Sequence, residues 1–110
     1  MPIPQTTRDF IETLVDYYIT VASSYKQIAQ IFVPDVVNVM DTTFGIIVGA
    51  VYSGFLQTYT NQKQKVTIED IDEFNQIMKR RAPQIKKAIL EAKLWSGCTL
   101  EINSNSLNVR

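Results

Sequence analysis

The sequence predicts a mainly α-helical fold, in which four to five helices form a compact bundle and a small C-terminal β-hairpin follows. Apolar residues recur at steps of three and four through most of the chain up to position 95, which is the period of an amphipathic helix. After position 97 the apolar residues alternate instead. A length of 110 residues with 45% hydrophobic residues is typical of a single globular domain, expected here over residues 1–110.

The first predicted helix spans about residues 7–32. Its apolar positions form one wide stripe, which is made up of Phe10, Leu14, Tyr17, Val21, Ile28 and Phe32. Pro34 ends this helix, because proline disfavours helical geometry in the residue before it. Pro34 and Asp35 favour a short helical turn over residues 35–40.

The next helix is predicted over about residues 42–60, with Asp41 or Thr42 as its N-cap. Residues 42–62 carry no charge, which raises the question of a membrane span. The apolar stretch is shorter than the roughly 20 residues that a spanning helix needs, and polar residues surround it. We therefore expect a buried core helix, with a membrane segment as the alternative.

Small residues line one side of this helix. Gly45, Gly49 and Ser53 are four positions apart and therefore share a face. Each glycine costs roughly 1 kcal/mol in a helix interior relative to alanine. Such a cost is tolerated where another backbone approaches closely, so the pattern predicts tight packing along this face.

Two further helices are predicted over about residues 67–81 and 83–95. Thr67 is the N-cap of the first, and Asp70 occupies the position that completes a capping box. Pro83 either kinks this segment or begins a new helix, because its ring disrupts the hydrogen-bond ladder.

The tail changes period, which predicts a β-hairpin over about residues 98–109. Apolar residues alternate with polar ones around a turn-like cluster at residues 103–106; they are Cys98, Leu100, Ile102, Leu107 and Val109. An isolated hairpin is marginal in water, so it is expected to lie on the helices or to pair with a partner.

The residues needed for ordinary catalysis are missing from the sequence. Histidine is absent, which removes the usual general base and the commonest metal ligand. Cys98 is the one cysteine and cannot form a zinc site alone. Glu69 and Glu73 share a helix face, but carboxylates in a first helical turn already have a structural role. We expect no enzymatic activity, no cofactor and no metal site.

The same features bear on localisation. A single cysteine cannot form a disulfide within the chain, which favours a reducing, intracellular setting. The first residues do not show the basic and apolar pattern of a secretory signal. A cytoplasmic protein is therefore expected.

Charge is neutral overall but uneven along the chain. Residues 1–60 carry −3, residues 61–110 carry +3, and residues 79–93 alone carry +5. On a continuous helix, seven-residue spacing places side chains close to one line. This spacing predicts a basic ridge that could neutralise phosphates, formed by Lys79, Arg80, Lys86, Lys87 and Lys93.

Two alternatives to phosphate binding stay open for the ridge. It could be a solvated face without a partner. It could also meet an acidic face of a neighbouring copy, which Asp9, Glu12 and Asp16 would supply. Head-to-tail contact of that kind builds rings or filaments.

The capped, basic segment from Thr67 to Trp95 and the tail over residues 98–109 resemble the small helical subunits of archaeal type I-A CRISPR effector complexes. The resemblance implies a short helical bundle with a β appendage and no catalytic site. It also implies a role in antiviral defence, in which such subunits line up along the complex and contact the nucleic-acid backbone. The neutral net charge is a departure from that pattern.

The sequence thus predicts a non-catalytic small subunit of a nucleoprotein complex. Its basic ridge would contact the RNA or DNA backbone, and its apolar or aromatic surface would contact neighbouring protein subunits. The alternative is a self-associating structural or regulatory protein of an archaeal virus or scaffold, without nucleic-acid binding. A membrane partner is not expected.

Overall fold

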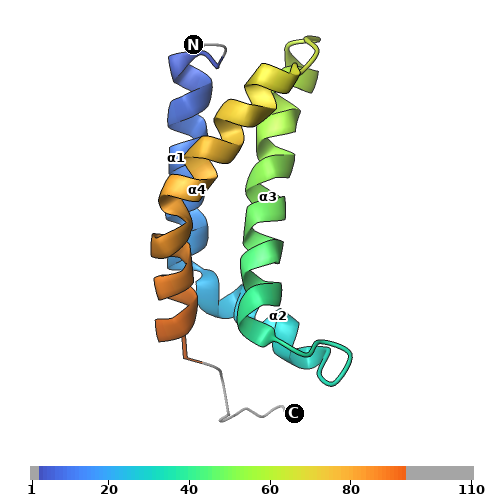
Figure 1. The fold of residues 1–110 in the computed structure, drawn as a ribbon, viewed down its shortest axis with the longest axis vertical. Helices are drawn as coiled ribbons and strands as arrows, with labels where there is room; N and C mark the ends of the chain where they lie inside the picture. The colour runs from blue at the N-terminus through green and yellow to red at the C-terminus, as the bar shows by residue number, and fades with distance from the viewer. Residues whose placement is uncertain (1–2, 94–110) are drawn as a thin grey trace.

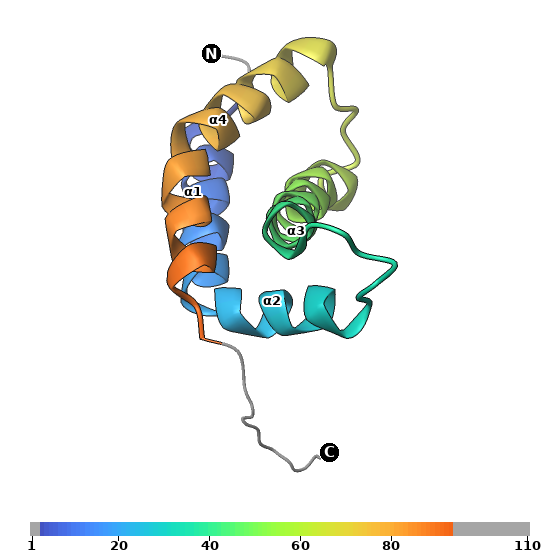
Figure 2. The same ribbon diagram turned by 60° about the horizontal axis from the view of Figure 1, so that its bottom comes forward.

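The computed structural model describes residues 3–93, which form four helices and contain no strand. These are α1 (Gln5–Thr20), α2 (Ala22–Ile31), α3 (Val39–Asn61) and α4 (Ile68–Glu91) (Figure 1). Seen along α3, the other three helices border it and leave one side uncovered (Figure 2). The mainly α-helical fold is confirmed, and the hairpin predicted over residues 98–109 lies outside the described residues.

The core forms where α1, α3 and α4 meet. Phe55 of α3 stacks on Phe74 of α4, with ring centroids 4.8 Å apart and an angle of 22° between the planes. The aliphatic core residues that surround this pair are almost fully buried; they are Ile11, Val15, Ile47, Val51, Ile77, Ile85 and Ile89. Their spacing of three and four is the pattern that predicts the helices.

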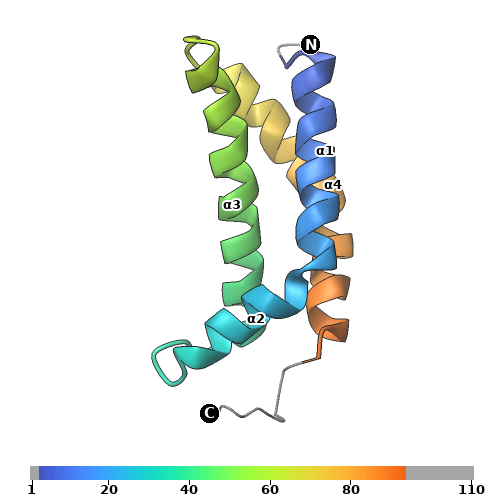
Figure 3. The same cartoon turned by 180° about the vertical axis from the view of Figure 1, so that it is seen from behind.

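The prediction of one helix over residues 7–32 is wrong, because the chain breaks at Val21 between α1 and α2. Val21 has φ −111° and ψ 20°, outside helical geometry. The Thr20 hydroxyl donates to the Tyr17 carbonyl at 2.6 Å beside this break. The turn sends α2 across the lower end of α1 and α3 (Figure 3), where Ala22 and Ala29 become buried.

The short helical turn predicted over residues 35–40 is also wrong, because residues 32–35 form a turn and α3 begins only at Val39. The N-cap is Asn38 rather than Asp41 or Thr42. Its side chain accepts a hydrogen bond of 2.9 Å from the Asp41 backbone N–H, which satisfies a donor that the helix itself leaves unpaired.

Close packing on α3 occurs at a different glycine from those predicted. Gly45, Gly49 and Ser53 are exposed, and a Cβ added at either glycine would meet nothing within 4 Å. At Gly54 an added Cβ would lie 2.6 Å from Leu14 Cδ1 of α1. The close approach is therefore between α1 and the Gly54 side of α3, and the predicted tight face is open.

Helix α4 is continuous from Ile68 to Glu91, so the prediction of two helices over residues 67–81 and 83–95 is wrong. Pro83 lies inside it, and the helix bends about halfway along (Figure 1). Buried residues before and after Pro83 hold both halves against the core, which offsets the lost hydrogen bond.

Both ends of α4 are fixed by side chains. The capping box predicted at Thr67 and Asp70 is confirmed, with reciprocal bonds of 3.1 Å and 3.0 Å. At the other end, Lys26 Nζ of α2 donates to the carbonyls of Ile89 and Ala92, at 2.9 Å and 3.1 Å. These carbonyls carry the negative end of the helix dipole, so Lys26 stabilises this terminus.

Helix α3 is the one helix within residues 3–93 that is long and apolar enough to cross a membrane, with a mean hydropathy of 1.5 over its most apolar part. Core helices of soluble proteins pass the same test. One face of α3 packs into the bundle through Ile47, Val51 and Phe55. Only 22% of the apolar part is buried, so much of α3 remains accessible.

Candidate functional site

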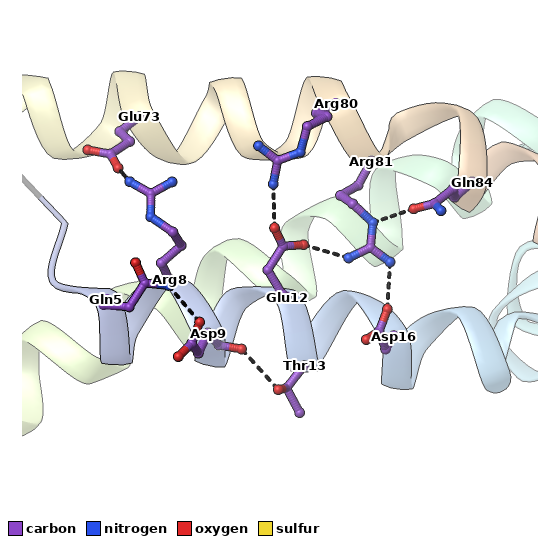
Figure 4. Close-up of polar contacts among 10 residues, drawn as sticks. All are labelled: Gln5, Arg8, Asp9, Glu12, Thr13, Asp16, Glu73, Arg80, Arg81 and Gln84. Carbon is purple, nitrogen blue, oxygen red and sulfur yellow. Dashed lines mark hydrogen bonds and ion pairs between the residues drawn. The ribbon is translucent and has the colours of Figure 1, made fainter. Parts of the chain in front are cut away.

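Charged side chains join α1 to α4 in a row made of two separate groups of ion pairs (Figure 4). Arg8, Glu12 and Asp16 are four positions apart, so they share the face of α1 that lies beside α4. Glu12 pairs with both Arg80 and Arg81, and Asp16 pairs with Arg81. The predicted acidic face therefore meets the chain's own α4 through two of its three members.

Arg81 pairs with two carboxylates of this row. Its guanidinium donates to Glu12 Oε1 and to Asp16 Oδ1, each at 2.5 Å, and its Nε donates to Gln84. Burial by itself would lower the pKa of Arg81, but the hydrogen bonds to Asp16 and Glu12 raise it above the usual value. With its side chain 15% exposed, Arg81 acts as a structural cation.

At the N-terminal end of the row the cation is on α1 and the carboxylate is on α4, the reverse of the pairs made by Arg80 and Arg81. Glu73 of α4 is buried and pairs with Arg8 of α1. It also accepts a hydrogen bond of 3.3 Å from the backbone N–H of Ile3, which ties the start of the chain to α4. Glu73 therefore ties both α1 and the start of the chain to α4.

The predicted ridge is divided between two sides of α4. Lys79 lines a groove with residues of α3, and Lys86 Nζ lies 5.3 Å from the centre of the Phe44 ring. On the other side, Arg80 pairs with Glu12, and Lys87 borders a hollow beside α1. The seven-residue spacing thus forms two short rows rather than one ridge.

Lys93 belongs to neither row. It lies beyond the last residue of α4 and lines a hollow with Ala22 and Ser23 of α2. The helix ends at Glu91, so the seven-residue spacing no longer fixes the direction of Lys93.

The lysines differ from the arginines in their partners. Arg80 and Arg81 are held by carboxylates of α1. Within the described residues, no carboxylate lies within 4.0 Å of the exposed ammonium groups of Lys79, Lys86, Lys87 and Lys93. The positive charge of α4 that is available to an outside ligand therefore comes mainly from lysine.

Two surfaces become visible only in three dimensions. The first is the groove between α3 and α4, lined by Phe44, Val48, Asn75, Met78, Lys79 and Ala82. The second is an apolar patch at the end of α2 and in the following turn, formed by Ile28, Ile31, Phe32, Val33 and Val37. Val37 is 95% exposed. The run of apolar residues before Pro34 signals the patch in the sequence, whereas the groove joins residues far apart and has no local signal.

Within the described part of the chain, no group of three or more His, Cys, Asp or Glu side chains could hold a metal ion. The chain matches no protein-family model, no curated protein and no solved structure. The function proposed below therefore rests on the residues of this chain.

Proposed function

We propose that this protein is a non-catalytic small subunit of a nucleoprotein assembly, which contacts the phosphates of RNA or DNA through the lysines of α4. The supporting observation is that the arginines of α4 have carboxylate partners and its lysines, within residues 3–93, do not. Carboxylates of α1 neutralise Arg80 and Arg81, whereas Lys79, Lys86 and Lys87 are exposed and unpaired among the described residues. Lysine binds phosphate as a point charge and does not read sequence.

The number of free lysines sets the expected strength of binding. Three or four phosphate contacts support weak, salt-sensitive binding rather than tight independent association. Such binding suits a subunit that other proteins hold against the nucleic acid. A subunit of a CRISPR-type effector complex in an archaeal cytoplasm is the form of assembly that the sequence resemblance implies.

A matched pair of variants tests this proposal. Lys86→Ala/Lys87→Ala removes one lysine from each side of α4. Lys63→Ala/Lys65→Ala removes the same charge from the exposed loop between α3 and α4. At low salt, fluorescence anisotropy with a labelled oligonucleotide is expected to show weaker binding for the first variant only. Equal binding by wild type and both variants would refute the proposal.

The apolar patch favours a second candidate function, self-association in a viral or scaffold protein without nucleic-acid binding. Exposed apolar patches often mark protein interfaces. The patch is at one end of the bundle (Figure 3), so a symmetric contact there would join two molecules end to end.

Sedimentation velocity distinguishes this candidate. Phe32→Ser/Val37→Ser removes two exposed members of the patch, and Ile68→Ser removes an exposed apolar residue at the start of α4. If the patch joins two copies, the wild type and Ile68→Ser sediment as dimers at high concentration, and the double variant sediments as a monomer. A wild type that stays monomeric at high concentration and low salt excludes self-association.

A further inference from the structure

The groove between α3 and α4 contains an aromatic ring and one cation, and a second cation lies over that ring. Phe44 and Val48 form one wall, and Met78 and Ala82 form the other. Its volume of about 240 Å³ falls below the roughly 300–1,000 Å³ of sites that enclose a drug-sized molecule. The groove therefore fits one planar group, held by apolar contact.

Two lysines of α4 lie at this groove or against Phe44, which lines it. Lys79 lines it directly, and Lys86 lies over the Phe44 ring. Seven helical residues separate them by about 10.5 Å along the axis. Neither has a carboxylate partner among the described residues. An anionic chain lying along the groove would thus meet a cation at two points, with the Phe44 ring on one wall.

We propose that this groove receives an unpaired base of single-stranded nucleic acid, stacked on Phe44, while Lys79 and Lys86 contact the flanking phosphates. Binding of single strands commonly combines a cationic track with aromatic side chains on which bases stack. The contact between Lys86 and Phe44 holds the ring and the ammonium group beside each other before the ligand arrives. When the strand binds, the flexible Lys86 side chain moves from the ring to a phosphate, and the base takes its place.

An acidic amphipathic peptide is the other ligand that an apolar groove with lysines could accept. The observations favour nucleic acid for two reasons. The groove is too small for the several apolar side chains that a docked helix inserts. Asn75 also lies at the groove and carries amide groups that can both donate to and accept from a base edge.

This inference rests on the proposed function and adds the ligand class, so its test must separate bases from phosphates. The probes are a labelled thymidine strand of about 15 nucleotides and an abasic strand of the same length, which carries the same phosphates. Wild type is expected to bind the thymidine strand about tenfold more tightly than the abasic strand. Phe44→Leu keeps an apolar side chain but removes the ring, and is expected to bind both strands with the lower affinity.

A second variant guards against a folding defect in Phe44→Leu. Ala82→Met extends a side chain into the groove from its other wall, and is expected to cause the same selective loss. Both variants are compared with wild type by circular dichroism and thermal unfolding.

Each outcome has a definite meaning. If wild type binds both strands with equal affinity, and Lys86→Ala/Lys87→Ala binds both more weakly, the base site is refuted and the phosphate contact remains. If wild type binds neither strand, the proposed function fails and the base site fails with it. If a peptide of alternating Leu and Glu binds in a Phe44-dependent manner and the thymidine strand does not, the groove is a peptide site and the inference is overturned.

Discussion

The guanidinium of Arg81 on α4 donates a hydrogen bond of 2.5 Å to the carboxylate of Asp16 on α1. Together with the ion pairs of Glu12, this contact uses two cations from the most basic part of the sequence, Arg80 and Arg81, to hold α4 against α1. It also separates two kinds of cation that the sequence alone treats as one group. The arginines hold α1 to α4, whereas Lys79, Lys86 and Lys87 have no carboxylate partner among the described residues.

The first prediction concerns this joint. Glu12→Gln removes the carboxylate shared by Arg80 and Arg81, so it is expected to lower the free energy of unfolding by about 1–2 kcal/mol, between the values for exposed and buried ion pairs. Thermal unfolding would show a midpoint lower by about 5–10 °C.

Asp9→Asn is the matched control, because Asp9 is exposed and its side chain contacts Gln5 on the same helix. Its effect is expected to stay within about 0.5 kcal/mol. If Glu12→Gln and Asp9→Asn unfold at the same temperature, the row between α1 and α4 does not stabilise the fold.

The second prediction uses two glycines of the same helix. Gly49→Ala is expected to raise the free energy of unfolding by about 1 kcal/mol, because alanine is the better helix former and its Cβ meets nothing within 4 Å. Gly54→Ala places a Cβ 2.6 Å from Leu14 Cδ1, so the Leu14 side chain must shift, and the cost of this shift offsets the gain in helix propensity.

Urea denaturation of both variants is the measurement. Gly54→Ala is expected to be neutral or destabilised while Gly49→Ala is stabilised. The reverse order would show that α1 and α3 do not approach as closely as described.

The third prediction concerns alkaline pH. Burial raises the pKa of Tyr59 above its usual value of about 10, and the negative charge of Asp70 raises it further. The unfolded phenol therefore loses its proton at lower pH than the folded one. The resulting stability is fully present below about pH 10 and is lost as the pH rises through the folded pKa.

Tyr59→Phe removes this dependence. Its free energy of unfolding is expected to fall less than that of wild type between about pH 9 and pH 11. The exposed Tyr17→Phe serves as the control. Parallel pH profiles for wild type and Tyr59→Phe would show that Tyr59 does not contribute.

The fourth prediction concerns α3. Its buried face packs into the bundle, so the protein is expected to remain in the aqueous phase when it is mixed with vesicles of neutral phospholipid and floated on a density gradient. Quantitative flotation with the vesicles would instead place the exposed side of α3 in a membrane.

The sequence predicted helices correctly where short-range signals determine them. The Thr67 capping box and the apolar spacing of α3 and α4 act over a few residues, so the sequence reveals them. No glycine or proline marks the break at Val21 in the sequence. The break instead accompanies the burial of Ala22 and Ala29 against distant helices, which local signals do not reveal. Pro83 predicted either a kink or the start of a new helix, and the structure has the kink, because packing on both sides of Pro83 keeps the bent α4 continuous.

The candidate site likewise has some residues that the sequence reveals and partners that it does not. The basic residues of α4 stand out in the sequence, but the single ridge that their seven-residue spacing predicted is wrong, because they lie on two sides of α4. The partners of Arg80 and Arg81 lie more than sixty positions away, at Glu12 and Asp16. Phe44 likewise reaches the lysines only through the packing of α3 on α4. Contacts of this range depend on topology, which composition and periodicity do not specify.

The salt dependence of binding to the labelled thymidine strand tests the central claim most directly. With three lysines on phosphates, the slope of log K against log salt concentration is expected to be about −2, since each contact contributes about −0.7 on a single strand. Lys86→Ala/Lys87→Ala is expected to reduce this slope by more than half, and Lys63→Ala/Lys65→Ala to leave it unchanged. A slope near zero for wild type, or equal slopes for wild type and Lys86→Ala/Lys87→Ala, would contradict the account.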